Sequence, residues 1–418
     1  MRVFVLLFLL SSSEGAALAL PRFAARNAGE CIQCHVNPTG GGMRNEYGRN
    51  VFEQAILPWS TSADPGSWMA PRSLSGDPAA DDGVRAPFGG EVTDWLAVGG
   101  DLRAAYIYIR PDRGLEPGAD PEVTSSFFLM QADLYHAATL NPWVSLVLDV
   151  GIYSGFEAWG LLRFFREPGD LDLMLKVGHF MPAFGIREVE HQLFTREGIG
   201  LGAQDRDTGL ELTTFAGPVT LNLSVLNGTL GDTAFDVNGS ERRTFEKAVA
   251  ARLAARAQIG WLRGQLGLSL YWNDGYSQPN PLFGGRLPAA SVGEASRGVT
   301  EVRKGAFLTL NLGRLTYLGD LALVDDDFAS DQLDDIGGYA SYQELSFVLR
   351  QGLELVGTFE FMEPDLEILD DSSTRAAVVV EFFPWPLTEL RAMVRRRWND
   401  DSPTGGTTDL VLFLHLFM

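Results

Sequence analysis

From about residue 94 to its end, the chain repeats short stretches in which apolar and polar residues alternate. In 171–177 every odd position is leucine or valine, whereas Asp172 and Lys176 fall between them. The final stretch, 409–418, has leucine at positions 410, 412, 414 and 416. Successive side chains of a strand point to opposite faces, so a period of two predicts strands with one apolar and one polar face. This region is therefore expected to be all-β.

About sixteen such stretches follow one another, each with the length of a tilted strand that crosses a bilayer. The predicted strands cover 94–110, 125–140, 143–154, 157–167, 171–185, 208–217, 219–229, 247–260, 262–274, 303–313, 315–327, 337–350, 353–364, 373–384, 388–400 and 407–418.

The connections alternate between tight turns and longer linkers. Tight turns occur at Asn141-Pro142 and Gly217-Pro218, and the longer linkers include 186–207 and 275–302. Outer-membrane barrels have short periplasmic turns and longer external loops. We therefore predict an antiparallel outer-membrane β-barrel over 94–418, with both chain ends on the periplasmic side. A soluble antiparallel sandwich is the alternative fold, but its loops need not alternate in length.

Composition and charge narrow the class of protein. The chain has 418 residues, of which 45% are hydrophobic, and its net charge of -21 argues against a nucleic-acid partner. Beyond the N-terminus no apolar run reaches the roughly 18 residues of a membrane-spanning helix. Aromatic residues near many strand ends are expected to contact outer-membrane lipid as interfacial girdles. They are Tyr106, Tyr108, Trp143, Trp159, Phe164, Phe165, Tyr271, Trp272, Phe382, Phe383, Trp385 and Trp398.

The N-terminus has the pattern of a secretory signal. Arg2 precedes the apolar run 3–10, and a polar stretch then ends in Ala17-Leu18-Ala19. A positive start, a short apolar run and small residues at a cleavage site are typical of a signal peptide. We predict a signal peptide over 1–19, a functional segment over 20–60 and a linker over 61–93.

The functional segment contains the only two cysteines of the chain, in Cys31-Ile32-Gln33-Cys34-His35. The C-x-x-C-H spacing lets two thiols bind the two vinyl groups of one porphyrin, with the histidine as axial ligand of the iron. We predict one covalently bound haem c (heme c) held by Cys31, Cys34 and His35. A disulfide or thioredoxin-like motif is an alternative, but the surroundings lack a βαβ pattern. A zinc knuckle would need further ligands at short spacing.

The sixth ligand of the iron is less constrained by the sequence. Met43 follows a glycine run that allows the chain to fold back over the ring, and it is our predicted metal ligand beside His35. Met69 in the linker, His415 in the last strand and an open site are alternatives. His136 and His179 fall in the apolar phase of their strands, which favours interfacial positions.

Two groups of charged residues have both a functional and a plain interpretation. Arg391, Arg395 and Arg397 share the polar face of one strand and either select anions or bind haem propionates, or neutralise lumen carboxylates such as Asp133 and Glu381. We favour neutralisation. The acidic run 325–335 is interpreted as a solvated external loop, because it lacks the order of a calcium loop.

Part of the barrel region resembles a known family. The stretch Val177-Gly-His-Phe-Met-Pro-Ala-Phe-Gly-Ile186, followed by Asp207-Thr-Gly-Leu-Glu-Leu212 and Val225-Leu-Asn-Gly228, resembles the central block of phosphate-selective-type porins. In those porins the loop after the first of these strands folds inward and narrows the pore. The resemblance implies that 186–207 is a constriction loop.

The whole layout is similar to that of fused cytochrome-porin proteins of bacterial outer membranes, some of which oxidise extracellular ferrous iron. Those proteins have a signal peptide, one C-x-x-C-H, an F/Y-G-R-x-F element and a barrel of about this size. Here the element reads Tyr47-Gly-Arg-Asn-Val-Phe52. The segment Asn37-Pro-Thr-Gly-Gly-Gly-Met43 departs from the layout.

Three classes of function follow. The first is an electron-transfer protein rather than a conventional enzyme, which moves electrons between periplasmic cytochromes or other carriers and an extracellular partner. The second is a solute-conducting porin whose haem segment docks partners or gates the pore. The third is a soluble periplasmic cytochrome. We favour the first, located in the bacterial outer membrane with the haem segment under or inside the barrel, as a possible homo-oligomer.

Overall fold

The computed structural model describes most of the chain from residue 21 onward. The described residues are 21–27, 29–59, 90–93, 95–114, 120–152, 155–165, 171–188, 193–203, 205–228, 247–275, 299–328, 334–369, 371–399 and 405–417. The predicted signal peptide 1–19, Met69, most of the linker 61–93 and Asp331 lie outside these ranges.

Within the described ranges, seventeen antiparallel strands form a single sheet. The first strand, β1 (Gly90–Thr93), is short, and sixteen longer strands follow it. These are β2 (Leu96–Pro111), β3 (Thr124–Asn141), β4 (Val144–Gly151), β5 (Gly155–Arg163), β6 (Leu171–Phe180), β7 (Asp207–Ala216), β8 (Val219–Leu226), β9 (Ala248–Ile259), β10 (Leu262–Gly275), β11 (Val299–Leu312), β12 (Leu315–Phe328), β13 (Ile336–Arg350), β14 (Leu353–Glu363), β15 (Ser373–Phe382), β16 (Thr388–Asn399) and β17 (Thr407–Phe417).

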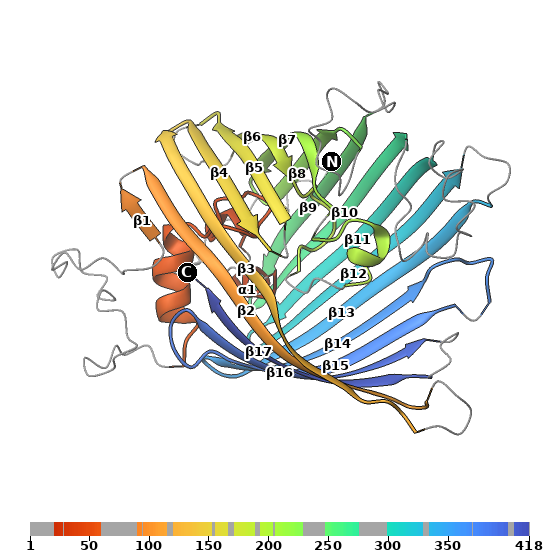
Figure 1. The fold of residues 1–418 in the computed structure, drawn as a ribbon. Helices are drawn as coiled ribbons and strands as arrows, with labels where there is room; N and C mark the ends of the chain where they lie inside the picture. Colours follow the sequence, from red (N-terminus) through yellow and green to blue (C-terminus); the bar gives the residue numbers. More distant parts are fainter. Residues whose placement is uncertain are drawn as a thin grey trace.

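The last strand pairs with β2, from Thr407 opposite Pro111 to Phe417 opposite Asp101, and this pairing closes the barrel (Figure 1). The protein is thus all-β, a closed antiparallel barrel of sixteen strands with one extra strand. All sixteen predicted strands are confirmed, with small shifts at their ends. The extra strand β1 lies in the predicted linker, and it pairs with 96–98 of β2, on the edge that β17 leaves free beyond Phe417.

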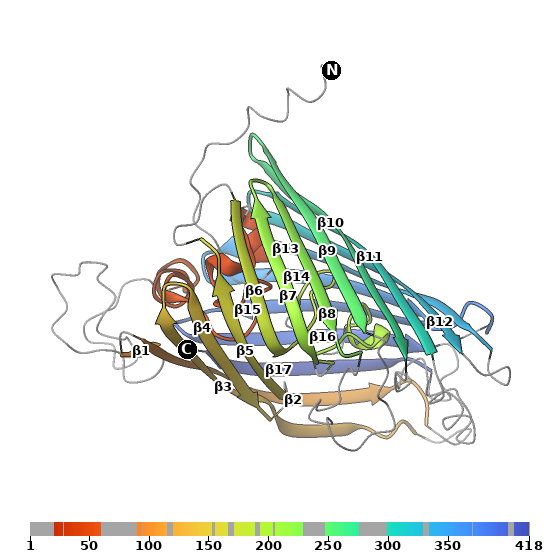
Figure 2. The same ribbon diagram turned by 90° about the horizontal axis from the view of Figure 1, so that it is seen from above.

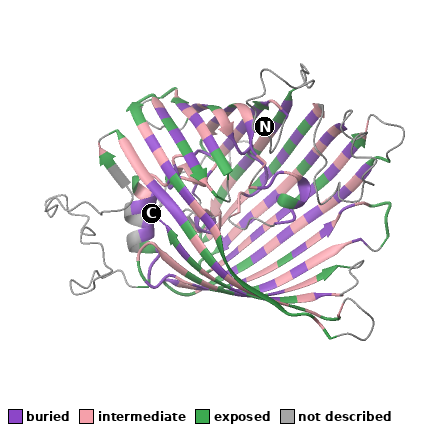
Figure 3. Cartoon of the chain, in the orientation of Figure 1, coloured by how far each residue is buried: buried purple, intermediate pink, exposed green. Residues whose placement is uncertain are grey.

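Exposure along the strands decides between the barrel and the sandwich. On β8, Asn222 is 2% exposed, whereas Leu223 is 42% and Val225 is 50% exposed. Figure 3 shows the same banding of buried and exposed residues along most strands. A soluble sandwich buries its apolar face, but here the apolar face points outward and the polar face inward, as in a lipid-embedded barrel.

Three of the predicted girdle aromatics face the other way. Trp159 and Tyr271 share the phase of buried lumen residues, and Phe383, which follows β15, packs against Phe23 inside the barrel. The prediction of lipid contact is wrong for these three, because proximity to a strand end does not fix which face a side chain occupies.

The N-terminal segment starts inside the barrel and reaches its open end near residue 59, beside the turn at Gly352 (Figures 1 and 2). It begins with α1 (Pro21–Asn27), which packs against β10, β11 and β12. A 3-10 turn, η1 (Cys31–Gln33), and a π-helix, η2 (Tyr47–Ile56), follow. The backbone of Trp59 then donates a hydrogen bond to the carbonyl of Phe383 at 2.7 Å. We call residues 21–59 the lumenal segment. No helix among the described residues is long and apolar enough to cross a membrane.

The loop between β6 and β7 also folds inward. The backbone N–H of Ile186 donates to Asp320 on β12 at 3.1 Å, and that of Phe194 donates to Glu360 on β14 at 3.1 Å. From β11, Arg303 donates to the carbonyl of Ile199 at 2.8 Å. The described part of 186–207 therefore crosses the lumen, as predicted for a constriction loop.

The lumenal segment and the inward loop share an apolar core with the barrel wall. Met43 belongs to the same buried cluster as Phe194 and Leu201 of the loop and Tyr135 of β3. Ile32 and Val36 pack against this cluster. The barrel is therefore filled over part of its depth by side chains rather than by water.

Candidate functional site in the barrel lumen

The C-x-x-C-H motif forms a compact turn inside the barrel. The backbone N–H groups of Cys34 and His35 both donate to the carbonyl of Cys31, at 3.1 and 3.0 Å. The side-chain amide of Asn45 donates to the carbonyls of Ile32 and Gln33 at 2.8 and 2.9 Å. Because Asn45 connects the C-x-x-C-H motif to the start of η2, this motif and the Y-G-R element form one folded unit.

Glycines make this folding possible at two places. Gly40 has a φ of 85°, and a Cβ there would lie 3.2 Å from the Cβ and Sγ of Cys31. Gly48 of the Y-G-R element packs so closely on the motif that a Cβ would lie 2.3 Å from the carbonyl oxygen of Cys34. Only glycine allows such close approaches without displacing the cysteine-bearing turn.

No disulfide joins the two cysteines, and Cys34 is fully buried. Burial raises the pKa of the Cys34 thiol to about 12, so the thiolate needed for reaction is disfavoured in the folded barrel.

Two cavities flank the motif. Cys31 lines a smaller one of about 60 Å³, and His35 lines a larger one of about 180 Å³. The larger cavity is lined by aromatic rings, guanidinium groups and carboxylates. Its phenylalanines are Phe23, Phe52, Phe383, Phe413 and Phe417, and its arginines are Arg22, Arg44, Arg103, Arg187, Arg206 and Arg391.

The chemistry of these groups fits a c-type haem. The two thiols and the imidazole are the donor set that such a haem requires. The aromatic rings suit the apolar faces of a porphyrin, and guanidinium groups bind carboxylates such as propionates in a bidentate manner. Gly40 leaves room beside the Cys31 sulfur. Among the described residues, no group of three or more His, Cys, Asp or Glu side chains is placed to hold a bare metal ion.

His415 lies in the wall of the larger cavity. Its Nδ1 is 2.9 Å from Glu389 and its Nε2 is 3.0 Å from Asp101. His415 on β17 thereby bridges Asp101 on β2 and Glu389 on β16, and both of its ring nitrogens are engaged by carboxylates.

The other proposed ligand, Met43, is buried in the apolar core, and neither cavity is lined by it. Its backbone carbonyl accepts a hydrogen bond from Val36 at 3.0 Å, next to the bridge between His35 and Arg44. The assignment of Met43 as sixth ligand stays a prediction, as do the roles of Cys31, Cys34 and His35.

The arginine ladder neutralises carboxylates in the described structure. Arg391 lies 3.5 Å from Glu381, as the favoured interpretation predicts. Arg395 and Arg397 both pair with Asp409, each at 3.0 Å. The acidic run is likewise partly paired, because Lys304 contacts Asp325 at 2.6 Å and Arg303 binds Asp326. His136 and His179 lie in the lipid-facing phase, as predicted.

The residues that anchor the lumenal segment were not identified from the sequence. Arg22 pairs with Glu344 at 3.0 Å and with Glu381 at 2.6 Å, and Arg26 pairs with Glu354 at 2.6 Å. The sequence gives little indication of this anchoring role, because Arg22 and Arg26 are two ordinary arginines near a predicted cleavage site. Buried ion pairs of this kind fix one position for the segment.

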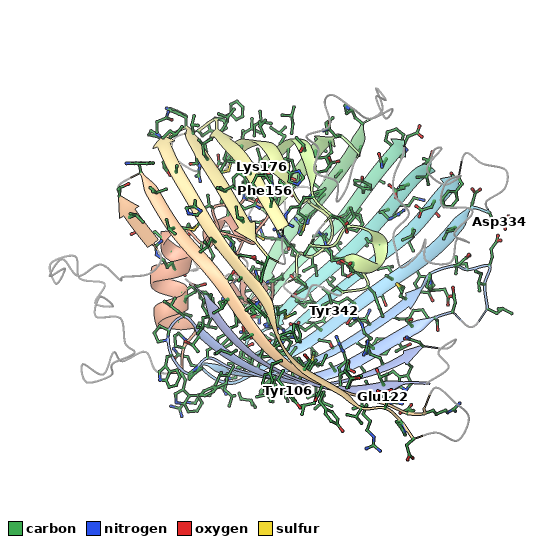
Figure 4. The ribbon with its side chains drawn as sticks, in the orientation of Figure 1. Tyr106, Glu122, Phe156, Lys176, Asp334 and Tyr342 are labelled. Atoms are coloured by element: carbon green, nitrogen blue, oxygen red, sulfur yellow. The ribbon has the colours of Figure 1, made fainter. Side chains whose placement is uncertain are left out.

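A second anchor explains the segment 37–43 that departs from the fused cytochrome-porin layout. Lys176 on β6, labelled in Figure 4, donates to the side chains of Asn37 at 3.2 Å and Thr39 at 3.4 Å. It also pairs with Glu211 at 2.7 Å and lies over the ring of Phe180. The Asn37-Pro38-Thr39 sequence thus binds a buried lysine of the barrel wall.

Known structures share this fold. The anion-selective porin from Comamonas acidovorans is similar with a TM-score of 0.53 and 10% identity, over 77% of this chain and 99% of that one. OprB of Pseudomonas putida has a TM-score of 0.52 and 12% identity, over 78% and 94%. The outer-membrane channel DcaP of Acinetobacter baumannii has a TM-score of 0.52 and 12% identity, over 79% and 100%.

No protein-family model and no curated protein matches the chain. At these identities the structural likeness concerns the fold alone. The chain therefore has a porin-like outer-membrane channel fold, and this fold points to the bacterial outer membrane as its location.

Proposed function

We propose that this protein carries one covalent haem on its lumenal segment and exchanges electrons between periplasmic carriers and an extracellular donor or acceptor. The observation that carries the proposal is the position of Cys31, Cys34 and His35 inside a porin-like barrel, beside a cavity of aromatic and arginine side chains. A redox group held there would lie in the lumen of the barrel.

Residues of the lumenal segment and of the barrel wall together hold the haem in this proposal. Cys31 and Cys34 hold the group through their sulfur atoms, and His35 provides the axial nitrogen. Arginines such as Arg187 and Arg206, which both contact Glu157, offer donors for propionates. When bound, a c-type haem supplies one-electron redox chemistry at its iron.

The packing around the motif favours electron exchange over solute flow. The apolar core that joins Met43 to Phe194 and Leu201 excludes water from one side of the motif. The buried pairs of Arg22 and Arg26 hold the segment in place. A fixed, partly desolvated environment limits the reorganisation that accompanies a change of charge.

The test uses the full chain expressed together with a haem-maturation system and purified in detergent. We expect covalent haem at one equivalent per chain, and liposomes containing the protein should pass electrons from an external reductant to an enclosed acceptor. The Cys31→Ser/Cys34→Ser variant, with a barrel of unchanged electrophoretic mobility, should pass none. A colourless wild-type protein, or equal electron passage by the variant, would overturn the proposal.

A second candidate is a solute channel whose lumenal segment acts as a gate. The porin structures that share the fold favour it, and one of them is named for anion selectivity. Liposome swelling separates the two candidates. An electron conduit should not admit small anions, whereas a channel should admit them at the same rate with and without haem.

A further inference from the structure

One strand contains an irregularity that faces the candidate site. On β3, Gln131 pairs with Arg103 of β2, but the next residue of β2, Ala104, pairs with Leu129. Met130 therefore has no partner position on β2 and forms a β-bulge. Bulges redirect a side chain and are common beside functional sites.

The bulge changes which residues of β3 face the lipid. On the side toward residue 141, even positions face outward, since Leu134 is 56% exposed and Tyr135 is 2% exposed. On the side toward residue 124, Phe128 pairs with the buried Ala105 of β2, whereas Phe127 pairs with Tyr106 and contacts its ring, so odd positions lie on the outer face. The change of phase occurs at Met130, whose side chain enters the lumen next to that of Gln131.

Met130 lines the same cavity as His35. A thioether is a ligand that binds haem iron opposite a histidine in many cytochromes c. The cavity thus has an imidazole from the lumenal segment and a thioether from the barrel wall on its surface.

The other candidate iron ligands among the described residues either use their donor atoms in other contacts or do not line the cavity. Met181 also lines the cavity, but its sulfur accepts a hydrogen bond from Arg196 at 3.0 Å. Both ring nitrogens of His415 contact carboxylates. Met43 is buried in the apolar core.

We infer that Met130 provides the sixth ligand to the iron, so that the barrel wall and the lumenal segment together complete the coordination. This inference rests on the proposed function. It has a structural consequence, since the iron can be six-coordinate only when the lumenal segment is inside the barrel. Six-coordinate iron would then indicate that the lumenal segment is docked inside the barrel.

The test compares haem-loaded Met130→Leu with the wild-type protein. Leucine keeps the apolar volume and removes the sulfur, so the bulge and the barrel should persist. We expect the wild-type ferric protein to show the charge-transfer absorption of a thioether-bound iron, and Met130→Leu to lose it completely at unchanged covalent haem content. Met130→His should give a spectrum with two histidine ligands and a lower reduction potential.

Met43→Leu and Met181→Leu are the matched controls and should keep the thioether band. Loss of the band in either control, its persistence in Met130→Leu, or its absence from the haem-loaded wild-type protein would overturn the inference while leaving the haem assignment intact. Absence of covalent haem from the wild-type protein would instead overturn the proposed function.

Discussion

The guanidinium of Arg22, near the start of the described chain, donates from Nη2 to both carboxylate oxygens of Glu381 on β15, at 2.8 and 2.6 Å. Both side chains are buried. The pair connects the first described helix to a strand near the other end of the sequence. It is one of several contacts that make the lumenal segment a structural part of the barrel.

Replacing Arg22 with methionine should release this segment. The change removes the buried cation that Glu344 and Glu381 share, with only Arg391 remaining near Glu381 at 3.5 Å, and breaking a buried pair costs about 3–5 kcal/mol. We expect the segment 21–59 to become sensitive to protease in detergent while the barrel keeps its heat-modifiable mobility. Arg314→Met, at an exposed turn, is the control and should leave cleavage unchanged. Equal resistance of both variants would contradict the anchoring role of Arg22.

A second test uses the buried ion pair between Lys176 and Glu211 in the barrel wall. Lys176→Met leaves a buried carboxylate unpaired and removes the donor to Asn37 and Thr39, so the free energy of unfolding should fall by about 3–5 kcal/mol. Lys176→Met/Glu211→Met removes both charges and should recover most of the loss. Denaturant unfolding followed by circular dichroism measures both. If the double variant is less stable than the single one, the unpaired Glu211 carboxylate is not the cause of the loss.

Gly41 tests the packing of the glycine run. It has a φ of 74°, and a Cβ there would lie 2.7 Å from the guanidinium of Arg187. Gly217 has a φ of 56° with open space around it. Alanine at Gly217 should cost only the strain of a left-handed backbone, about 1–2 kcal/mol, and alanine at Gly41 should cost more.

The loss of stability at Gly41 beyond that at Gly217 should be smaller in Gly41→Ala/Arg187→Ala, because the double variant lacks the contact with the guanidinium. Thermal unfolding of the variants in one detergent provides the comparison. Equal losses for Gly41→Ala and Gly217→Ala would show that Arg187 moves aside without cost.

Burial of Cys34 predicts slow alkylation of this thiol in the protein made without haem maturation. Cys34 is 0% exposed, so a maleimide should label it slowly in the folded barrel and rapidly after denaturation. Mass spectrometry of the intact chain counts the labels. Arg22→Met should speed the labelling, because it frees the segment. Rapid labelling of both thiols in the folded wild-type barrel would place the motif outside the lumen.

The lipid-facing surface has its own test. Leu412, in the middle of β17, is 45% exposed on the outer face. Arginine at a midplane position of a barrel costs about 2–4 kcal/mol, and near the interface about 0–1 kcal/mol. We expect Leu412→Arg to destabilise the refolded barrel in lipid vesicles far more than Thr408→Arg, near the strand end. Similar losses at both positions would argue against a bilayer around this face.

The sequence by itself determined the barrel. The period of two in stretches such as 171–177 and the alternation of turn lengths both follow from local backbone geometry, so sixteen strands and their outward apolar face are visible without coordinates. The C-x-x-C-H motif is likewise local, since its chemistry needs only three residues within a span of five.

Tertiary structure alone decided what fills the barrel. Arg22 meets Glu381, and Lys176 meets Asn37, across separations that no local pattern encodes. The extra strand β1 exists because β17 ends opposite Asp101 and leaves an edge of β2 to be paired. The bulge at Met130 depends on the register between β2 and β3, which is a property of two strands rather than one. Side chains brought together by closure of the barrel therefore define the site, because only closure places the lumenal segment against the wall.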